Sequence, residues 1–351
     1  MNEALSTDLM LPASRPMLSL VVLSFRNFET TTGPCLATLL SAITEASQVG
    51  LVQLMLVDNA SDDGSASRCA AWALSHPAVL YLAQPKNLGF AGGMNAGVAM
   101  TTGDWVCLVN NDTLFPPGAI TALLETLARV PENVAMVGPV TNAAGNGQRL
   151  PLPTVGMESV ALVGAAAMLI PTGLLTPSYR TDFFCVAVRR CAWQQLGGLD
   201  TAFGLGYYED FDFSLRLQQT GLAQVIAEDV FIAHVGSATF SALGDQHNVL
   251  MRRNRALLRE RHPGVHFEHV REGNAAALRH LLAVVHESGW THSLRLRAAW
   301  RLAALLQDEA KSPFKRWRWR WATRDVRRTL AAAGIEARFP AAPTLTTRTQ
   351  R

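Results

Sequence analysis

The sequence lacks the features typical of membrane-spanning and disulfide-linked proteins. No run of 18 apolar residues occurs in its 351 residues, so it predicts no membrane-spanning helix. Residues 1–16 contain Glu3 and Asp8 and no long apolar run, unlike a signal peptide, and we expect a flexible N-terminus there. The five cysteines form no CxxC pair and stand in apolar surroundings, which favours reduced cysteines in a cytoplasmic protein.

The small net charge of +3 hides opposite charges in two parts of the chain. Residues 1–239 contain 10 Lys and Arg against 19 Asp and Glu, a net charge of −9. Residues 240–351 contain 21 against 9, a net charge of +12. This asymmetry predicts two regions with different partners, and the basic region could face anionic lipid, nucleic acid or a polyphosphate.

Short apolar runs alternate with helical patterns along the first third of the chain. The strands are expected at 18–24, 51–57, 79–83 and 105–109, and the helices at 30–48, 67–75, 92–100 and 117–129. Such alternation predicts an α/β protein with a doubly wound, mostly parallel sheet. Residues 141–182, rich in Gly, Pro, Thr and Ala, are expected to form loops and short strands around a site.

Three further elements and a long helical region are expected after this segment. Strands are predicted at 185–189 and 225–232, and a helix at 211–220 that Gly221 ends. From Asn248 to about Ala333 the pattern is helical, with breaks at Pro263-Gly264 and Pro313.

Polar clusters follow the predicted strands at the edge where open parallel sheets bind ligands. They are Ser24 to Asn27, Asp58-Asn59 and Asn110 to Asp112, and an acidic cluster follows at Glu209 to Asp212. Asp and Asn also begin turns and cap helices, which is the alternative interpretation of each cluster alone.

Six segments in this order resemble the family 2 glycosyltransferases with a GT-A fold, in particular bacterial rhamnosyltransferase-like, O-antigen and cell-surface polysaccharide transferases. The segments are Val21–Asn27, Leu56–Ser65, Asn87–Gly97, Leu108–Thr113, Gly197–Asp200 and Tyr207–Phe213. The resemblance implies a catalytic domain at 17–240, followed by a basic, mainly helical region at 241–351.

The resemblance implies a binding site for a nucleotide diphosphate sugar, UDP- or dTDP-linked. Asp58 could accept a hydrogen bond from a pyrimidine N3–H, and Phe25 could stack on the base or belong to the core. The glycines after Asn87 do not have the spacing of a dinucleotide-binding fingerprint. The residues expected to bind the donor are Ser24, Phe25, Asn27, Asp58, Asn59, Asn87, Gly89, Gly92, Asn95, Asn110 and Asn111.

The resemblance also implies a divalent cation, Mn²⁺ or Mg²⁺, on the donor diphosphate. Such a cation neutralises the charge that grows on the leaving group, and it prefers oxygen ligands, with imidazole tolerated by Mn²⁺. Asp112, His234 and Asn110 are the expected ligands. The family often has an acidic residue where Asn110 stands, and a lone histidine such as His234 can instead be a packed or capping residue.

The acidic cluster is expected to activate the acceptor. In an inverting transfer of a hexosyl or deoxyhexosyl group, one carboxylate takes the proton of the attacking hydroxyl. By resemblance this base is Asp210, assisted by Glu209, while Tyr207, Tyr208 and Asp212 bind a glycan or lipid-linked glycan acceptor. The alternative for the acids alone is stabilisation of a helix N-terminus.

Two other functions compete with this one. A sugar-nucleotide pyrophosphorylase would need a Gly-rich basic loop after the first strand, where this chain has Ser24 to Phe28. A degenerate GT-A domain would bind nucleotide or a partner without catalysis, and Asn110 is the feature that supports it.

Residues 311–321 alternate arginine with tryptophan in the basic region. Such a segment could be a solvated helix with core tryptophans, could bind nucleic acid, or could lie at a bilayer surface. We favour peripheral contact with an anionic membrane at its inner, cytoplasmic face, and we expect no specific nucleic acid partner.

Overall fold

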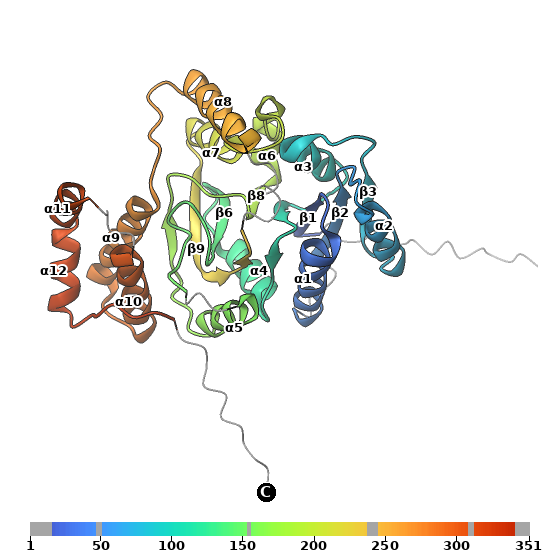
Figure 1. Cartoon of the computed structure of the whole chain (residues 1–351). Coiled ribbons are helices and arrows are strands. Elements are labelled where there is room, and N and C mark those ends of the chain that lie inside the picture. The colour runs from blue at the N-terminus through green and yellow to red at the C-terminus, as the bar shows by residue number, and fades with distance from the viewer. Residues whose placement is uncertain (1–15, 47–50, 153–155, 237–244, 308–311, 341–351) are drawn as a thin grey trace, which may run out of the picture.

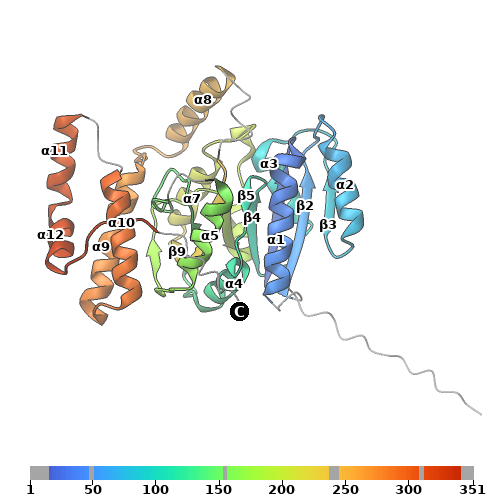
Figure 2. The same ribbon diagram turned by 60° about the horizontal axis from the view of Figure 1, so that its bottom comes forward.

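An eight-stranded sheet with helices on both faces forms the body of the protein (Figures 1 and 2). The computed structural model describes residues 16–46, 51–152, 156–236, 245–307 and 312–340. In spatial order the strands are β3 (Leu80–Ala83), β2 (Val52–Asp58), β1 (Leu18–Ser24), β4 (Trp105–Asn110), β8 (Cys185–Arg189), β6 (Val134–Val140), β9 (Ala223–Phe231) and β7 (Leu175–Pro177).

The sheet is mostly parallel, as the sequence predicts. The first four strands of the order run parallel to one another, and β6 runs parallel to β9. In contrast, β8 lies in the middle of the sheet antiparallel to both of its neighbours, and β7 is an antiparallel edge strand. The reversed strand β8 comes directly after the segment expected to form loops around a site.

Alternate residues of the central strand β1 pack under different helices. Leu20 and Val22 lie in the cluster under α1 and α4, while Val21 and Leu23 lie in the cluster under α3 and α7. A strand that is apolar on both faces is typical of a parallel sheet covered on both sides. The covering helices are α1 (Gly33–Glu45), α2 (Ser65–Ser75), α3 (Gly89–Ala99), α4 (Ala119–Arg129), α5 (Met157–Met168), α6 (Arg190–Leu196) and α7 (Glu209–Gln219).

The sequence prediction missed two of these helices, α5 and α6. Within residues 141–182 it expected loops and short strands, and the structure has the short strand β7 but also the helix α5. The Gly and Ala content of α5 reflects close packing on the sheet, because a Cβ atom at Gly164 would lie 1.9 Å from the ring of Phe231. Composition alone cannot distinguish a helix that needs small residues for close packing from a loop that is rich in the same residues.

The helical C-terminal extension predicted from the sequence is present. It consists of α8 (Asp245–Arg261), α9 (Val270–Ser288), α10 (His292–Gln307), α11 (Pro313–Ala322) and α12 (Arg324–Ala332). Helices α9 and α10 lie side by side at the β7 edge of the sheet, with α11 and α12 outside them (Figure 1). The predicted boundary at 240 lies outside the described residues, as does nearly all of the predicted flexible N-terminus, so the domain division stays a prediction.

No helix within the described residues is long and apolar enough to cross a bilayer. All five cysteines are free, four of them buried and Cys191 exposed.

A buried cluster of charged residues fixes the C-terminal helices to the sheet. Glu228 of β9 accepts hydrogen bonds from Arg297 Nη1 (2.8 Å) and Arg301 Nη2 (2.6 Å), both on α10. All three side chains are at most 2% exposed. Burial raises the pKa of Glu228, but the charges of the two arginines lower it more, so that the pKa lies below its ordinary value. The carboxylate is therefore needed to balance two buried guanidinium groups.

We expect Glu228→Ala to lower the free energy of unfolding by about 3–5 kcal/mol, because it removes the carboxylate that two buried guanidinium groups share and leaves only the more distant Asp229, 3.9 Å from Arg297. Chemical denaturation followed by circular dichroism measures the change. The control Glu287→Ala removes an exposed carboxylate of α9 and is expected to change stability by less than about 0.5 kcal/mol. Equal unfolding midpoints for the two variants would show that the buried cluster does not hold the helices in place.

Candidate active site

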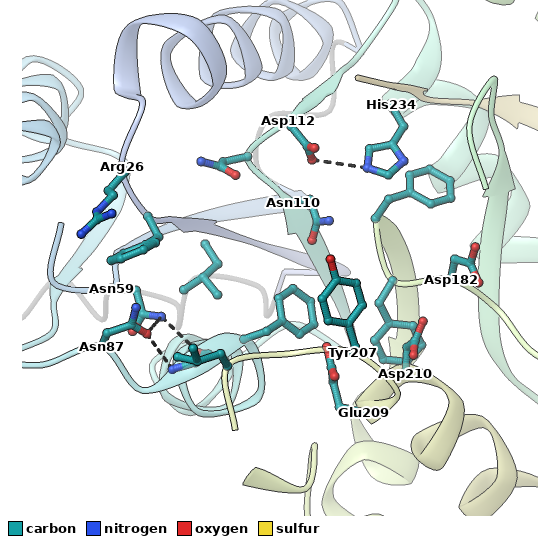
Figure 3. Close-up of a pocket in the computed structure, with 18 of the residues that line it drawn as sticks. Arg26, Asn59, Asn87, Asn110, Asp112, Asp182, Tyr207, Glu209, Asp210 and His234 are labelled. Carbon is teal, nitrogen blue, oxygen red and sulfur yellow. Dashed lines mark hydrogen bonds and ion pairs between the residues drawn. The ribbon is translucent and has the colours of Figure 1, made fainter. Parts of the chain in front are cut away.

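A cavity of about 440 Å³ opens at the carboxyl ends of β1 and β4, the edge that the sequence predicted (Figure 3). Its wall brings together segments that are far apart in the chain. The predicted site residues that line it are Phe25, Asn27, Asn59, Asn87, Gly89, Asn110, Asn111, Asp112, Tyr207, Tyr208, Glu209, Asp210 and His234.

A two-stranded sheet brings Asp112 beside His234. Strand β5 (Thr113–Leu114) pairs with β10 (Ala233–His234), and the backbone N–H of Val235 donates to the carbonyl oxygen of Asp112 at 2.9 Å. As a result, His234 Nε2 lies 3.4 Å from Asp112 Oδ1. Burial lowers the pKa of His234, but its contact with the Asp112 carboxylate raises the pKa more, and the net shift is upward.

The donors at this end of the cavity fit a divalent cation. Asp112 Oδ1 is buried with His234 Nε2 as its one partner within the described chain, at the long distance of 3.4 Å, and Asn110 lines the same wall. The other ring nitrogen of His234, Nδ1, lies 2.8 Å from the carbonyl oxygen of Ala143, which leaves Nε2 facing the carboxylate. Among the described residues no three His, Cys, Asp or Glu side chains are placed to hold a metal ion by themselves. A cation here would therefore complete its coordination with diphosphate oxygens and water, as Mg²⁺ commonly does.

Two acidic residues begin α7 at another side of the cavity. Glu209 and Asp210 follow Tyr207 and Tyr208, both of which have a left-handed backbone, with φ of 73° and 76°. Burial raises the pKa of Glu209, and the neighbouring Asp210 charge raises it further. Burial also raises the pKa of Asp210, as does Asp182, whereas Arg180 lowers it. Neighbouring carboxyls in such surroundings titrate as a pair.

Asp182 is a cavity residue that the sequence interpretation missed. It lies next to β8, in the segment expected to form loops, and its carboxylate pairs with the guanidinium group of Arg180. Arg180 in turn lies over the ring of Phe211 at 5.2 Å from its centroid. The antiparallel direction of β8 brings Asp182 to this wall, and no local sequence pattern gives that direction.

A buried asparagine of α8 holds the loop that leads into the acidic pair. Asn254 is 0% exposed, and its Nδ2 lies within hydrogen-bonding distance of the carbonyl oxygens of Phe203 (2.7 Å), Gly206 (2.8 Å) and Tyr207 (3.1 Å). The two N–H groups of this amide can satisfy these three carbonyl oxygens if one N–H is shared, in the loop that ends at the left-handed Tyr207 and Tyr208. Asn254 therefore contributes to the position of Glu209 and Asp210 without lining the cavity.

Gly89 lets the same loop approach the first turn of α3. A Cβ atom at Gly89 would lie 2.0 Å from the carbonyl oxygen of Gly204, and the φ of Gly89 is +70°. A side chain would therefore clash with backbone and strain the turn. Gly89 is needed for contact between two protein segments, whereas the sequence interpretation assigned it to the nucleotide.

The cavity wall near β1 and β2 consists of polar groups that bond to one another. Asn59 Nδ2 donates to Asn87 Oδ1 (3.0 Å) and to the carbonyl oxygen of Gly89 (3.1 Å). Arg26 and Asn27 have left-handed backbones, with φ of 60° and 55°, and Arg26 pairs with Asp62. The sequence interpretation included Arg26 in a quoted segment but did not predict that it lines the cavity.

Five predicted site residues, Ser24, Asp58, Gly92, Asn95 and Asp212, do not line the cavity, and their roles stay predictions. In each case the residue contacts other parts of the protein. Ser24 Oγ pairs with Thr32 Oγ1 at 2.9 Å, and Asp58 accepts from Ser61 Oγ at 2.6 Å. This contact is the turn-forming role considered as the alternative for Asp58.

The other three contact residues of their own or neighbouring segments. Gly92 packs against Leu88, and Asn95 Nδ2 donates to the carbonyl oxygen of Leu199 at 2.8 Å. Asp212 is 1% exposed, and its carboxylate pairs with Arg216 at 2.7 Å and His262 at 2.9 Å.

Comparison with known proteins agrees with this geometry. Residues 19–171 match the family model described as glycosyl transferase family 2. With the relatives described below, this match supports a glycosyltransferase of family 2. Its sheet and helical extension confirm the predicted GT-A fold, and an enzyme of this family uses a nucleotide-sugar donor. The acidic pair, His234 and α8 of this glycosyltransferase all lie beyond the matched residues.

Two named relatives and one solved structure are similar to this glycosyltransferase. The N-acetylglucosaminyl-diphospho-decaprenol L-rhamnosyltransferases of Mycobacterium tuberculosis strains CDC 1551 and H37Rv are 28% identical over 229 residues, covering 58% of this chain and 72% of theirs. A mannosyltransferase from Pyrobaculum calidifontis in complex with GDP-Man and Mn²⁺ is 18% identical, with a TM-score of 0.48 over 92% of this chain and 82% of its own. That superposition is too loose for its ligands to be transferred to this chain.

We expect Asn254→Ala to reduce turnover by about 10- to 100-fold, because a small misplacement of reacting groups can be this costly. The lost hydrogen bonds should also lower stability by about 1–3 kcal/mol. Steady-state kinetics and thermal unfolding measure the two effects. The control Asn248→Ala changes an exposed asparagine of the same helix. Unchanged turnover in a folded Asn254→Ala protein would mean that the loop keeps its geometry without this side chain.

Proposed function

We propose that this enzyme transfers a hexosyl or deoxyhexosyl group from a UDP- or dTDP-sugar to a hydroxyl group of a glycan or lipid-linked glycan, with inversion and with a divalent cation. One observation carries the proposal. Asp112 and His234 on one side, and Glu209 and Asp210 on another, line the same cavity with Asn110 and Tyr207 between them (Figure 3). A donor diphosphate and an acceptor hydroxyl could thus be held in one cavity.

The donor diphosphate would lie next to Asp112, His234 and Asn110, because these side chains offer the oxygen and nitrogen donors that Mn²⁺ or Mg²⁺ accepts. A bound cation would neutralise the negative charge that develops on the diphosphate as the sugar leaves. The nucleoside would lie toward Phe25, Asn27 and Asn59, the polar and aromatic wall at the ends of β1 and β2.

Asp210 would act as the general base. Its carboxylate accepts the proton of the acceptor hydroxyl, the hydroxyl oxygen forms a bond to the anomeric carbon, and the bond from that carbon to the diphosphate oxygen breaks. The diphosphate leaves with the bonding electron pair, and a single displacement inverts the anomeric centre. Arg180 favours the charged form of Asp210, whereas burial and the Asp210 charge raise the pKa of Glu209, and these directions favour Asp210 as the charged member of the pair.

The acceptor is proposed to be attached to a lipid through a diphosphate, and the transferred sugar to be rhamnosyl. The name of the relative from Mycobacterium tuberculosis, an N-acetylglucosaminyl-diphospho-decaprenol L-rhamnosyltransferase, supports both. Tyr207 and Tyr208 line the cavity beside the acidic pair and would contact the acceptor sugar. With such an acceptor, the enzyme would act in the cytoplasm, in peripheral contact with the inner face of the membrane.

We expect Asp210→Asn to reduce turnover by about 10²–10⁴-fold and to leave donor affinity nearly unchanged, because the base acts on the acceptor. Steady-state kinetics and isothermal titration with the nucleotide diphosphate test the two parts. The wild-type kcat/KM should also fall with decreasing pH at a pH above the ordinary aspartate pKa of about 3.9, since the raised pKa protonates the base early. Near-full turnover in a folded Asp210→Asn protein would sink the assignment.

We expect the nucleotide diphosphate to raise the melting temperature more in Mn²⁺ or Mg²⁺ than in EDTA, because the ligand and the cation bind the folded state together. Asp112→Ala should abolish the metal-dependent part of the shift, and His234→Ala should weaken it. Glu132→Gln, at an exposed position away from the cavity, is the control. An identical shift in EDTA and in metal for the wild type rules out this cation site.

A further inference from the structure

Helix α11 presents three large aromatic side chains to solvent. Phe314, Trp317 and Trp321 are 66%, 64% and 66% exposed. Their spacing of three and four residues puts them on one side of the helix, and the rings of Phe314 and Trp317 stack with centroids 6.4 Å apart. Contiguous exposed apolar surface of this kind marks an interaction site more often than ordinary solvent-facing surface.

Basic side chains flank this aromatic face, and the helix has no acidic residue. They are Lys315, Arg316, Arg318 and Arg320, all exposed. With apolar rings on one side and cations beside them, α11 is amphipathic. Its composition is that of helices that lie in the interface of a bilayer. Tryptophan is favoured at the boundary between headgroups and acyl chains, and Lys and Arg are attracted by anionic lipid.

Contacts on the opposite side of α11 turn the aromatic face outward. Trp319 is half-buried against the apolar cluster of α9 and α10, and Arg271 lies over its ring at 5.6 Å from the centroid. Arg279 of α9 donates to the carbonyl oxygen of Ala322 at 3.3 Å. In both views α11 lies at the end of the C-terminal helices nearer to α8, the helix that holds the loop beside the cavity.

We propose that α11 docks the enzyme on an anionic bilayer, with Phe314, Trp317 and Trp321 in the interface and the basic residues on lipid phosphates. A bilayer fits better than nucleic acid, because proteins bind single strands in a basic groove that follows the backbone, whereas these rings share one side of an exposed helix. The proposal specifies the membrane contact within the proposed function. Its test measures binding without donor or acceptor, so it can fail while transfer activity stands.

Flotation of the 351-residue chain with vesicles tests the docking. Vesicles of phosphatidylcholine alone are compared with vesicles that also contain phosphatidylglycerol, at low and high salt. We expect binding to require the anionic lipid and to weaken with salt. Each basic residue near such a surface raises affinity about fivefold, so Lys315→Ser, Arg316→Ser and Arg318→Ser together should lower binding about 100-fold.

The aromatic face is tested separately. Phe314→Ser, Trp317→Ser and Trp321→Ser together should remove the binding that persists at high salt. The matched control replaces three exposed apolar residues of the catalytic domain, Leu74, Met100 and Leu169, by serine and should bind as the wild type does. Thermal unfolding verifies that each variant is folded.

Three results would overturn the proposal: equal recovery with neutral and anionic vesicles, no recovery with either, or equal losses in the control and the α11 variants. Binding of single-stranded RNA that depends on the same residues, without vesicle binding, would assign the face to nucleic acid. Concentration-dependent dimerisation that the aromatic variant abolishes, again without vesicle binding, would assign it to a second copy of the chain.

Discussion

The site depends on keeping two adjacent carboxyl groups, Glu209 and Asp210, partly withdrawn from water at the start of α7. Taking charged groups out of water is unfavourable, so the protein must compensate for it locally. Arg180 offers a compensating charge to Asp210, and the hydrogen bonds of Asn254 hold the strained loop ahead of the pair. The same desolvation raises the pKa of Asp210, which makes a carboxylate a better proton acceptor near neutral pH.

Much of the fold could be predicted because it follows from local patterns. Strands β1, β2 and β4 are apolar runs that end at polar residues, and the structure has β1 to β4 within one residue of the predicted ends. The structure also contains the reversed strand β8 and the helix α5. Both depend on packing against strands that are distant in the sequence, so a short stretch of sequence does not predict them. The family resemblance supplied the acidic pair, His234 and Asp112, and the two-stranded sheet of β5 and β10 explains why the last two meet.

The site was predicted less completely than the fold, and the reason is chemical. A polar residue at a strand end can face a ligand or complete a turn, and the sequence does not distinguish the two. Asp58 completes a turn with Ser61, whereas the neighbouring Asn59 lines the cavity. Asp182 and Asn254 reach the site through tertiary structure, from segments that carry no catalytic motif.

The positive charge of the C-terminal region serves two different purposes. Arg297 and Arg301 are buried on Glu228 and join the helices to the sheet, whereas the arginines of α11 face solvent. The net charge of the sequence cannot distinguish buried arginines from exposed ones, because it carries no information on burial.

The central claim is that one cavity supports a single displacement at the anomeric carbon with Asp210 as base. The most direct measurement is the anomeric configuration of the product, determined by proton nuclear magnetic resonance from a nucleotide-sugar donor of known configuration. The account predicts a product with the opposite anomeric configuration to the donor. A product that retains the donor configuration would contradict it, because a single displacement cannot retain the configuration at the anomeric carbon.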